Sequence, residues 1–379
     1  NTPRMVYTLL NILSTIVIFQ LLLLSVFLFS VKGGKSRSNK LLATFFLLLA
    51  INLTDGLLVY YGFYERFPAL AHVEDGFVFL IGPVLFFYTK SVVYRRFEWK
   101  VGHLFHLIPF IAFTVVFQIY YHLQPSEYQH LIQSAIQRQQ LPAGFYYSIA
   151  VVYAHVGTYL YFAYREIIFY RQQLQQRFSL LHKRNLDWLM FMILSVGVML
   201  LITLMYSFLP LATQELLHAG LIAVIAFIFV FVNTIVWKAL NQPLIFSGVE
   251  PETEIATTAA SLSELERADC DRKLMHAIMT EHAFLNSDLT LDELAERTNI
   301  PSKKLSQFIN EYYRQNFFDF VNTYRINEAK RILTESKDPK LTVLEVMYQS
   351  GFNSKSPFNT LFKKKTGQTP SEFRKGLQK

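Results

Sequence analysis

Long apolar runs fill the first 240 positions of the chain, and shorter runs with helical spacing fill the last hundred. A helix that crosses a bilayer needs about 20 mostly apolar residues in succession. We expect seven such helices, at about 7–31, 41–63, 76–94, 103–122, 144–164, 188–210 and 218–240. The apolar character then falls abruptly. The pattern therefore predicts an all-α chain with an N-terminal seven-helix transmembrane bundle and a C-terminal part outside the membrane.

Basic residues between the runs predict the orientation of these helices. The second, fourth and sixth connections carry only Arg66 and Arg138. The first, third and fifth connections carry Lys32, Lys35, Arg37, Lys40, Arg95, Arg96, Lys100, Arg165, Arg171, Arg177, Lys183 and Arg184. Because basic loops remain in the cytoplasm, we expect a multi-pass membrane protein. Its N-terminus would lie outside and its C-terminus in the cytoplasm.

The first run admits two interpretations. It is longer than the core of a signal peptide and a basic flank follows it at 32–40, so we expect an uncleaved span. If the run were instead a cleaved signal peptide, six spans would remain. The C-terminus would stay in the cytoplasm in either case.

Composition and charge divide the chain further. Hydrophobic residues make up 52% of the chain and charged residues 17%, which is unusual for a soluble protein. Residues 241–270 carry six acidic residues against one basic residue, and residues 271–379 carry 18 basic against 13 acidic. We therefore expect a membrane domain at 1–240, an acidic cytoplasmic linker at 241–270 and a basic domain at 271–379. The basic domain suits an anionic partner.

Two copies of one pattern lie in the basic domain, at 290–309 and 342–362. Each copy opens with a Thr-x-x-Glu capping box, which satisfies two backbone amides at the start of a short helix. A turn and a second helix follow, with apolar residues inward and polar residues outward. Two short helices that cross closely around a turn form a helix-turn-helix, whose second helix meets base edges in the major groove of DNA. We expect a stiff helix at about 317–334 to join the copies.

Local residues set the expected turns and outward faces of the two copies. Ser302 and Ser354 are the expected caps of the second helices, and Gly351 supplies a left-handed turn. The residues expected to face outward are Lys303, Lys304, Ser306, Gln307 and Asn310 in the first copy and Lys355, Ser356, Asn359 and Thr360 in the second. The cluster Lys363, Lys364 and Lys365 is expected to bind phosphates.

Residues 272–379 resemble the AraC/XylS-type DNA-binding domain. The likeness rests on Ala329-Lys-Arg-Ile-Leu333, Gly351-Phe352, Phe362-Lys-Lys and Gly367-Gln-Thr-Pro-Ser-Glu-Phe-Arg374. The resemblance implies two helix-turn-helix units in adjacent major grooves of double-stranded DNA. By motif position, the implied base contacts are Lys303, Ser306, Gln307, Lys355, Ser356, Asn359 and Thr360, and the phosphate contacts are Lys304, Lys363, Lys364 and Lys365.

Two positions depart from the family pattern. Arg314 stands where the family usually has glycine, which puts the local turn in doubt. Met347 replaces a small residue, so the helices of the second copy would cross less closely. The first 240 residues resemble the multi-span sensor regions fused to such domains in some bacteria, through their layout and through Gly82-Pro83 and His106-Leu-Ile-Pro109. This resemblance implies the bacterial inner membrane.

Ionisable residues within the apolar runs are the candidate sensor residues. Asp55 is expected to face the bundle interior, and His155 is expected to hydrogen-bond to a neighbouring helix rather than to a ligand. His103 and His106 share a helical face but have no acidic or sulfur partner nearby in the sequence, so we expect no metal site. The single cysteine, Cys270, excludes an intramolecular disulfide.

The connection at 165–187 carries one apolar face, formed by Ile167, Ile168, Leu174, Phe178 and Leu181. We expect this segment to extend the fifth span and to lie on the lipid headgroups. The alternative is a surface that contacts the DNA-binding domain.

These patterns predict a membrane-embedded one-component transcription regulator that is not an enzyme and needs no cofactor. Its partners would be double-stranded DNA and the lipid bilayer, with RNA polymerase, a second copy of the chain and an unidentified small-molecule or envelope signal left open. The alternative is a membrane transporter or enzyme whose fused DNA-binding module controls its own expression. Loss of transport in Asp55→Asn with DNA occupancy intact would favour that alternative.

Overall fold

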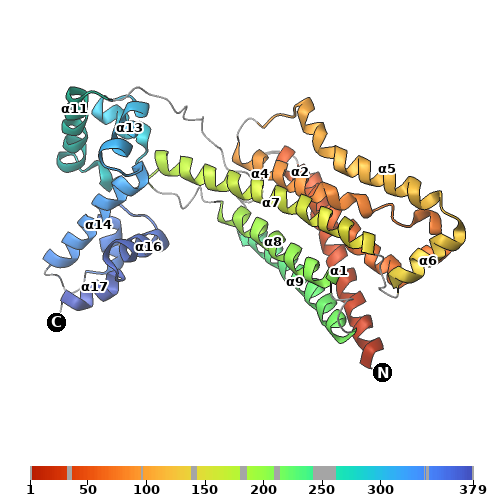
Figure 1. The fold of residues 1–379 in the computed structure, drawn as a ribbon. Coiled ribbons are helices and arrows are strands. Elements are labelled where there is room, and N and C mark those ends of the chain that lie inside the picture. The colour runs from red at the N-terminus through yellow and green to blue at the C-terminus, as the bar shows by residue number, and fades with distance from the viewer. Residues whose placement is uncertain are drawn as a thin grey trace. The chain divides into compact units, whose positions relative to one another are not determined.

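The structure, a computed structural model, describes residues 2–31, 36–94, 97–137, 143–179, 186–208, 214–241, 262–336, 338 and 341–377. Every element named within these ranges is a helix, which confirms the all-α prediction (Figure 1). The chain divides into two compact units. Unit 1 consists of 1–167 and 186–252, and unit 2 consists of 168–185 and 253–379.

Unit 1 consists of helices, most of them long and apolar. The helices that contribute to it are α1 (Thr2–Ser30), α2 (Ser36–Tyr60), α3 (Phe63–Arg66), α4 (Val78–Val93), α5 (Ile108–His122), α6 (Ser126–Gln137), α7 (Ala143–Arg177), α8 (Asp187–Phe208) and α9 (Gln214–Asn241). Three 3-10 turns lie between them, at Pro68–Leu70, Asp75–Phe77 and Val101–Leu107. Helix α7 continues from unit 1 into unit 2.

Five helical stretches in the described ranges are long and apolar enough to cross a membrane. They are Leu10–Ser30, Arg37–Tyr60, Asp75–Val93, Val101–His122 and Asp187–Ser207. The apolar stretch Gly220–Ile235 of α9 is shorter, and the expected run at 144–164 lies in the tyrosine-rich α7. The expected number of seven spans is therefore not confirmed.

Many large apolar side chains of these helices are exposed on the outside of unit 1, where contact with water would be unfavourable. Phe19 is 65% exposed, Val116 68% and Met205 71%. Each square ångström of apolar surface that stays in water forgoes about 25 cal/mol of stabilisation. Inside the unit, helices are joined by hydroxyl groups, since Ser25 Oγ donates to the Ala43 carbonyl at 2.9 Å and Ser38 Oγ to that of Ser91 at 3.3 Å. Apolar exteriors with polar contacts between helices are typical of membrane proteins.

Unit 2 contains nine named helical elements in the part of 262–377 that the structure describes. They are α11 (Glu264–Met275), the π-type turn His276–Thr280, the 3-10 turn Ala283–Leu285, α12 (Leu291–Thr298), α13 (Ser302–Tyr312), α14 (Phe317–Glu335), α15 (Val343–Gln349), α16 (Lys355–Thr366) and α17 (Pro370–Leu377). Helix α11 starts at a Ser263–Glu266 capping box, and Leu262, Cys270 and Leu274 enter the same core as α12 and α13.

Helix α14 joins two separate hydrophobic cores, and it confirms the stiff helix expected at 317–334. Its first half contributes Phe317, Phe320 and Val321 to the core around α12 and α13. Its second half contributes Ile326, Ala329 and Leu333 to the core around α15 and α16. Figure 1 shows α14 running from the neighbourhood of α13 to that of α16 and α17. Because one continuous helix belongs to both cores, it fixes the two helix-turn-helix units relative to each other.

Candidate DNA-binding interface

The first helix-turn-helix consists of α12 and α13. Its capping box forms as expected, because Glu293 N donates to Thr290 Oγ1 at 3.1 Å and Thr290 N to Glu293 Oε2 at 3.0 Å. Asn299 ends α12 in a left-handed conformation, with φ +48°. The expected cap at Ser302 is wrong by one residue. Pro301 is the N-cap of α13, and Ser302 Oγ instead donates to Asp292 Oδ1 at 2.5 Å, which ties the start of α13 to α12.

The second helix-turn-helix consists of α15 and α16. Its capping box also forms, with Glu345 N donating to Thr342 Oγ1 at 3.1 Å and Thr342 N to Glu345 Oε2 at 2.7 Å. Gly351 has φ +86°, which confirms the left-handed turn. Ser354 is the N-cap of α16, as expected, although its side chain accepts no capping hydrogen bond. The two copies therefore share the same local construction.

The two departures from the family pattern are accommodated locally. Arg314 adopts the left-handed conformation that glycine would take, with φ +55°. A residue other than glycine pays a steric penalty there. Met347 is buried in the core around α15 and α16. The unbranched thioether of methionine can fill an irregular space between crossing helices.

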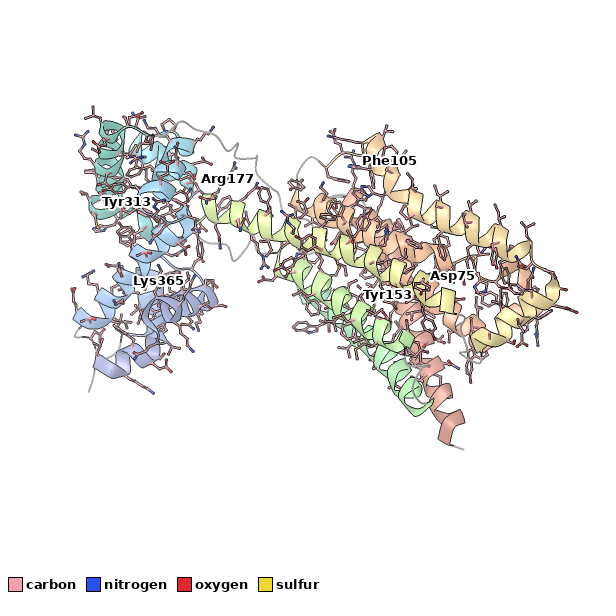
Figure 2. All side chains as sticks on the ribbon, in the orientation of Figure 1. Asp75, Phe105, Tyr153, Arg177, Tyr313 and Lys365 are labelled. Atoms are coloured by element: carbon pink, nitrogen blue, oxygen red, sulfur yellow. The ribbon has the colours of Figure 1, made fainter. Side chains whose placement is uncertain are left out.

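The polar face of the second recognition helix, α16, is open to solvent. Its exposed side chains include all four expected base contacts and the three lysines that follow, namely Lys355, Ser356, Asn359, Thr360, Lys363, Lys364 and Lys365. Lys365 Nζ donates to Thr323 Oγ1 of α14 at 3.2 Å. Figure 2 shows Lys365 among the side chains of this part of the module. The face thus offers polar groups beside a run of positive charge, the combination required for bases and phosphates.

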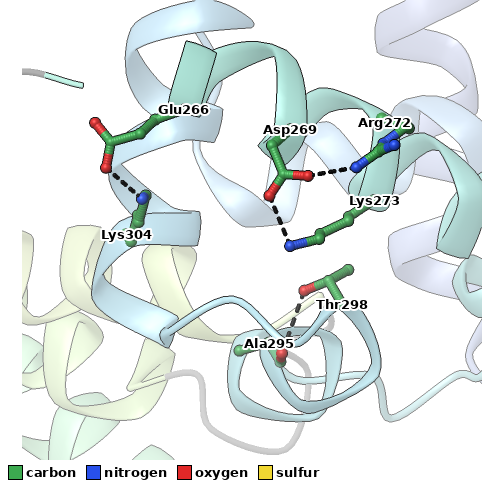
Figure 3. A network of polar contacts seen from close by, with 7 residues as sticks. All are labelled: Glu266, Asp269, Arg272, Lys273, Ala295, Thr298 and Lys304. Atoms are coloured by element: carbon green, nitrogen blue, oxygen red, sulfur yellow. Dashed lines mark hydrogen bonds and ion pairs between the residues drawn. The ribbon is translucent and has the colours of Figure 1, made fainter. Parts of the chain in front are cut away.

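The polar face of the first recognition helix, α13, is partly engaged within the protein. Lys303 is exposed, and Gln307 Nε2 donates to Glu311 Oε1 at 2.9 Å. Lys304 Nζ lies 2.6 Å from Glu266 Oε1 of α11, and this contact helps to lower the pKa of Glu266 to about 2 (Figure 3). The expectation that Ser306 faces outward is wrong, because Ser306 is only 8% exposed.

The cause of this burial is the segment at 168–179, which belongs to unit 2. Gln176 of α7 lies against Ser306 and Asn310, and Ser179 is enclosed by Arg325 and Asn322 of α14. The expectation that the 165–187 connection lies on lipid headgroups is therefore wrong for Gln176, Phe178 and Ser179, where the alternative, contact with the DNA-binding module, holds. Leu181 lies outside the described residues.

The two candidate sensor residues have partners in unit 1. Tyr64 OH donates to Asp55 Oδ1 at 2.8 Å. His155 Nε2 donates to the Phe79 carbonyl of α4 at 3.1 Å, which confirms the expected bond to a neighbouring helix. His106 Nδ1 lies 2.5 Å from Tyr159 OH. Over the ranges that the structure describes, no group of three or more His, Cys, Asp or Glu side chains is arranged to hold a metal ion.

Glu74, in the turn before α4, extends the Asp55 site, and sequence reasoning missed it. Burial, together with a hydrogen bond to Asp55 and the Asp55 charge, raises the pKa of Glu74 to about 8. A carboxyl with a raised pKa in the folded state binds its proton more tightly there than in the unfolded chain. The folded state therefore loses stability as the pH rises from the unfolded-state pKa towards the folded-state pKa. For Glu74 this window runs from 4.5 to about 8.

We expect Asp55→Asn to lower the pKa of Glu74, because the substitution removes the Asp55 charge, which raises that pKa. Asp75→Asn should lower it less, since Asp75 contributes through its charge alone and to a smaller extent. Infrared difference spectra of the carboxyl groups during a pH titration would measure both changes. An unchanged Glu74 titration in Asp55→Asn would show that the two carboxyls are not coupled.

Comparison with known proteins finds a family match for part of unit 2. A helix-turn-helix domain family matches residues 294–376. An uncharacterised HTH-type transcriptional regulator of Staphylococcus aureus (strain COL) is 36% identical over 89 residues, which cover 24% of this chain and 12% of the relative. The Msm operon regulatory protein of Streptococcus mutans is 25% identical over 97 residues, which cover 26% of this chain and 34% of that protein.

A search of solved structures gives one further match. The C-terminal domain of AraT, a response regulator from Geobacillus stearothermophilus, is 26% identical and matches 31% of this chain and 88% of its own, with a TM-score of 0.25. The chain spans only 12% of the length of the Staphylococcus relative. Residues 294–376 thus form a helix-turn-helix domain of the AraC type, and this chain is one of the proteins that carry it.

Proposed function

We propose that this chain is a membrane-embedded one-component transcription regulator. The observation that supports it is the pair of matched helix-turn-helix units joined by α14. The described part of the chain also contains five helical stretches that are apolar and long enough to cross a bilayer. The exposed face of α16 and the corresponding face of α13 would contact base edges in adjacent major grooves. Recognition helices that bind successive grooves lie about 34 Å apart, one turn of the duplex, and a rigid connecting helix would maintain such a spacing.

The membrane part would supply the signal. Basic residues concentrate in alternate connections, which supports a cytoplasmic C-terminus and hence access to DNA. Asp55, with Tyr64 and Glu74, forms a polar site at the end of α2 that a ligand or a pH change could alter. We propose 241–270 as the linker between the membrane domain at 1–240 and the DNA-binding domain at 271–379. RNA polymerase and a second copy of the chain are further proposed partners.

Asn359→Ala should change sequence preference. Asn359 is exposed on α16 at a position expected to meet a base edge. Loss of a good base contact costs roughly 1–3 kcal/mol of discrimination at one base pair. Affinities for a panel of single-base variants of the bound site would show a weakened preference at one position. Equal weakening on every sequence would contradict a base-reading role.

Lys364→Ala should weaken binding on all sequences, because a phosphate carries no base identity. Lys364 is exposed in the lysine run at the end of α16. Removing one phosphate contact reduces the slope of log affinity against log salt concentration by about one unit. The salt dependence of binding, compared with that of Asn359→Ala, measures the difference. An unchanged slope would remove Lys364 from the phosphate contacts.

The direct test of the proposed function is DNA selection by the full chain in phospholipid nanodiscs. A library of random duplexes is passed over the protein, and the retained sequences are read. Enrichment of a two-part site, with affinity that falls steeply as salt rises, is the expected result. A protein scaffold whose C-terminal module bound another protein would enrich no sequence and would show no salt-dependent affinity for DNA.

A further inference from the structure

The end of α7, defined here as residues 174–179 and called the α7 end, pairs with the backbone of the DNA-binding module. Phe178 forms an antiparallel bridge with Thr290, the first residue of the first capping box. Ser179 N donates to the Leu289 carbonyl at 3.3 Å, and Ser179 Oγ donates to the same oxygen at 2.6 Å. Phe178 and Ser179 are both buried. The segment is therefore held by main-chain pairing and by the hydroxyl group of Ser179.

Helix α14 binds the same segment through two buried side chains. The Ser179 carbonyl accepts from Asn322 Nδ2 at 2.8 Å and from Arg325 Nη1 at 3.3 Å, and Ser179 Oγ accepts from Arg325 Nη2 at 3.0 Å. Arg325 is fully buried. A buried guanidinium needs acceptors for its donors. The α7 end supplies two of these acceptors, although Ser179 lies 146 residues before Arg325 in the sequence.

Gln176 brings the α7 end onto the first recognition helix. Gln176 Oε1 accepts from Asn310 Nδ2 at 2.9 Å and from Ser306 Oγ at 3.5 Å. Gln176 Nε2 donates to Asn310 Oδ1 at 3.4 Å. Ser306, one of the expected base contacts, is consequently buried. The matching face of α16 is exposed, so the two recognition helices differ in their access to DNA.

We propose that the α7 end is an internal ligand of the DNA-binding module and competes with DNA for α13. This inference rests on the proposed function, because it takes Ser306 as a base contact. Side chains recognise base edges by contacting them directly. The polar groups of Ser306 and Asn310 are already hydrogen-bonded to Gln176 and are therefore not available to DNA in this arrangement. Helix α7 is continuous from Ala143 to Arg177 and also contributes buried residues Val156 and Leu160 to unit 1. A signal that shifted α7 would thus act on α13 through one helix.

Gln176→Ala in the full chain in nanodiscs tests the competition. The probe is a duplex enriched from a random library by the wild-type chain. Gln176→Ala should bind it about three- to tenfold more tightly, the effect of losing hydrogen bonds of ordinary strength in the docked state. Gln172→Ala is the matched control, since Gln172 is exposed on the same helix. Its affinity should equal that of the wild type.

A reversible cross-link between the α7 end and α13 tests the same inference by strengthening the contact instead of weakening it. Gln176→Cys and Asn310→Cys, joined by a short linker that reductant cleaves, would hold the α7 end on α13. The native Cys270 is buried and should not react. The locked protein should bind the duplex at least about tenfold more weakly, the equivalent of one lost base contact. Reductant should restore the affinity of the same sample.

The outcomes separate the inference from the proposed function. Equal affinities of the wild type, Gln176→Ala and the locked protein would overturn the inference and leave the proposed function standing. A cross-link that joins two chains rather than one would overturn the assignment of the α7 end as an internal ligand. No DNA binding by any form, the wild type included, would overturn the proposed function and the competition with it.

Discussion

Gly351→Ala should destabilise the second helix-turn-helix strongly. Gly351 has φ +86°, and a Cβ added there would lie 2.7 Å from the Phe284 carbonyl oxygen and 2.9 Å from Leu285 Cα. The left-handed conformation alone costs a residue other than glycine about 1–3 kcal/mol. The contacts are to backbone, which cannot rotate away as a flexible side chain could. We therefore expect a loss at the upper end of that range or beyond, about 3 kcal/mol.

Gly367→Ala is the matched control for this prediction. Gly367 also has a positive φ, +78°, but a Cβ there would meet no atom within 4 Å. Both variants carry the backbone strain, and only Gly351→Ala carries the clash. Hydrogen exchange of peptides from 341–377 in the full chain should therefore rise more in Gly351→Ala. Equal exchange in the two variants would contradict the close approach of Gly351 to residues 284 and 285.

Arg325→Met should also destabilise the DNA-binding module strongly. Arg325 Nε donates to the Phe284 carbonyl at 2.7 Å and Nη2 donates to the Asn286 carbonyl at 2.7 Å, in addition to the two bonds to Ser179. Burial lowers the pKa of Arg325 to about 9, so the guanidinium remains charged at neutral pH. Methionine fills a similar volume but donates nothing. Each buried acceptor left without a partner costs about 1–3 kcal/mol, and we expect about 4 kcal/mol for the group.

Arg331→Met is the matched control, because Arg331 lies on the same helix with its side chain 55% exposed. It forms ion pairs with Glu328 and Glu335 at the surface. Exposed ion pairs contribute little to stability, so Arg331→Met should leave the unfolding transition nearly unchanged. The stabilities of Arg325→Met and Arg331→Met are compared by urea titration of the full chain, with unfolding monitored by hydrogen exchange of peptides from 262–336. Similar destabilisation by both substitutions would show that the buried hydrogen bonds of Arg325 contribute no more to stability than the surface ion pairs of Arg331.

Features that depend on neighbouring residues were predictable from the sequence. The capping boxes at Thr290 and Thr342 follow from a Thr-x-x-Glu spacing that brings hydroxyl and carboxylate to the same helix start. The left-handed turn at Gly351 and the connecting helix α14 were also predictable. The cap at Ser302 was misplaced because Pro301 already has the extended backbone of an N-cap, φ −54° and ψ 134°.

Contacts between distant residues were not predictable from such patterns. The apolar spacing of Leu174 and Phe178 indicated a buried face but did not indicate what covers it. Ser179, Arg325 and Asn322 interact across more than 140 residues of sequence. Nothing local marks Ser179 as a partner of a buried arginine. The sequence predicted seven membrane spans, whereas five helical stretches in the described ranges are long and apolar enough, because α7 does not qualify and the apolar stretch of α9 is short.

The central claim is that the chain binds specific DNA sites while it is held in the membrane. The most direct measurement maps where the full-length, membrane-bound protein lies on its own genome. A variant with Lys303, Lys355 and Asn359 all replaced by alanine serves as the control. Discrete peaks upstream of genes, present for the wild type and lost in the variant, are the predicted result. Absence of peaks under several growth conditions, with the protein present in the membrane, would contradict the proposed function.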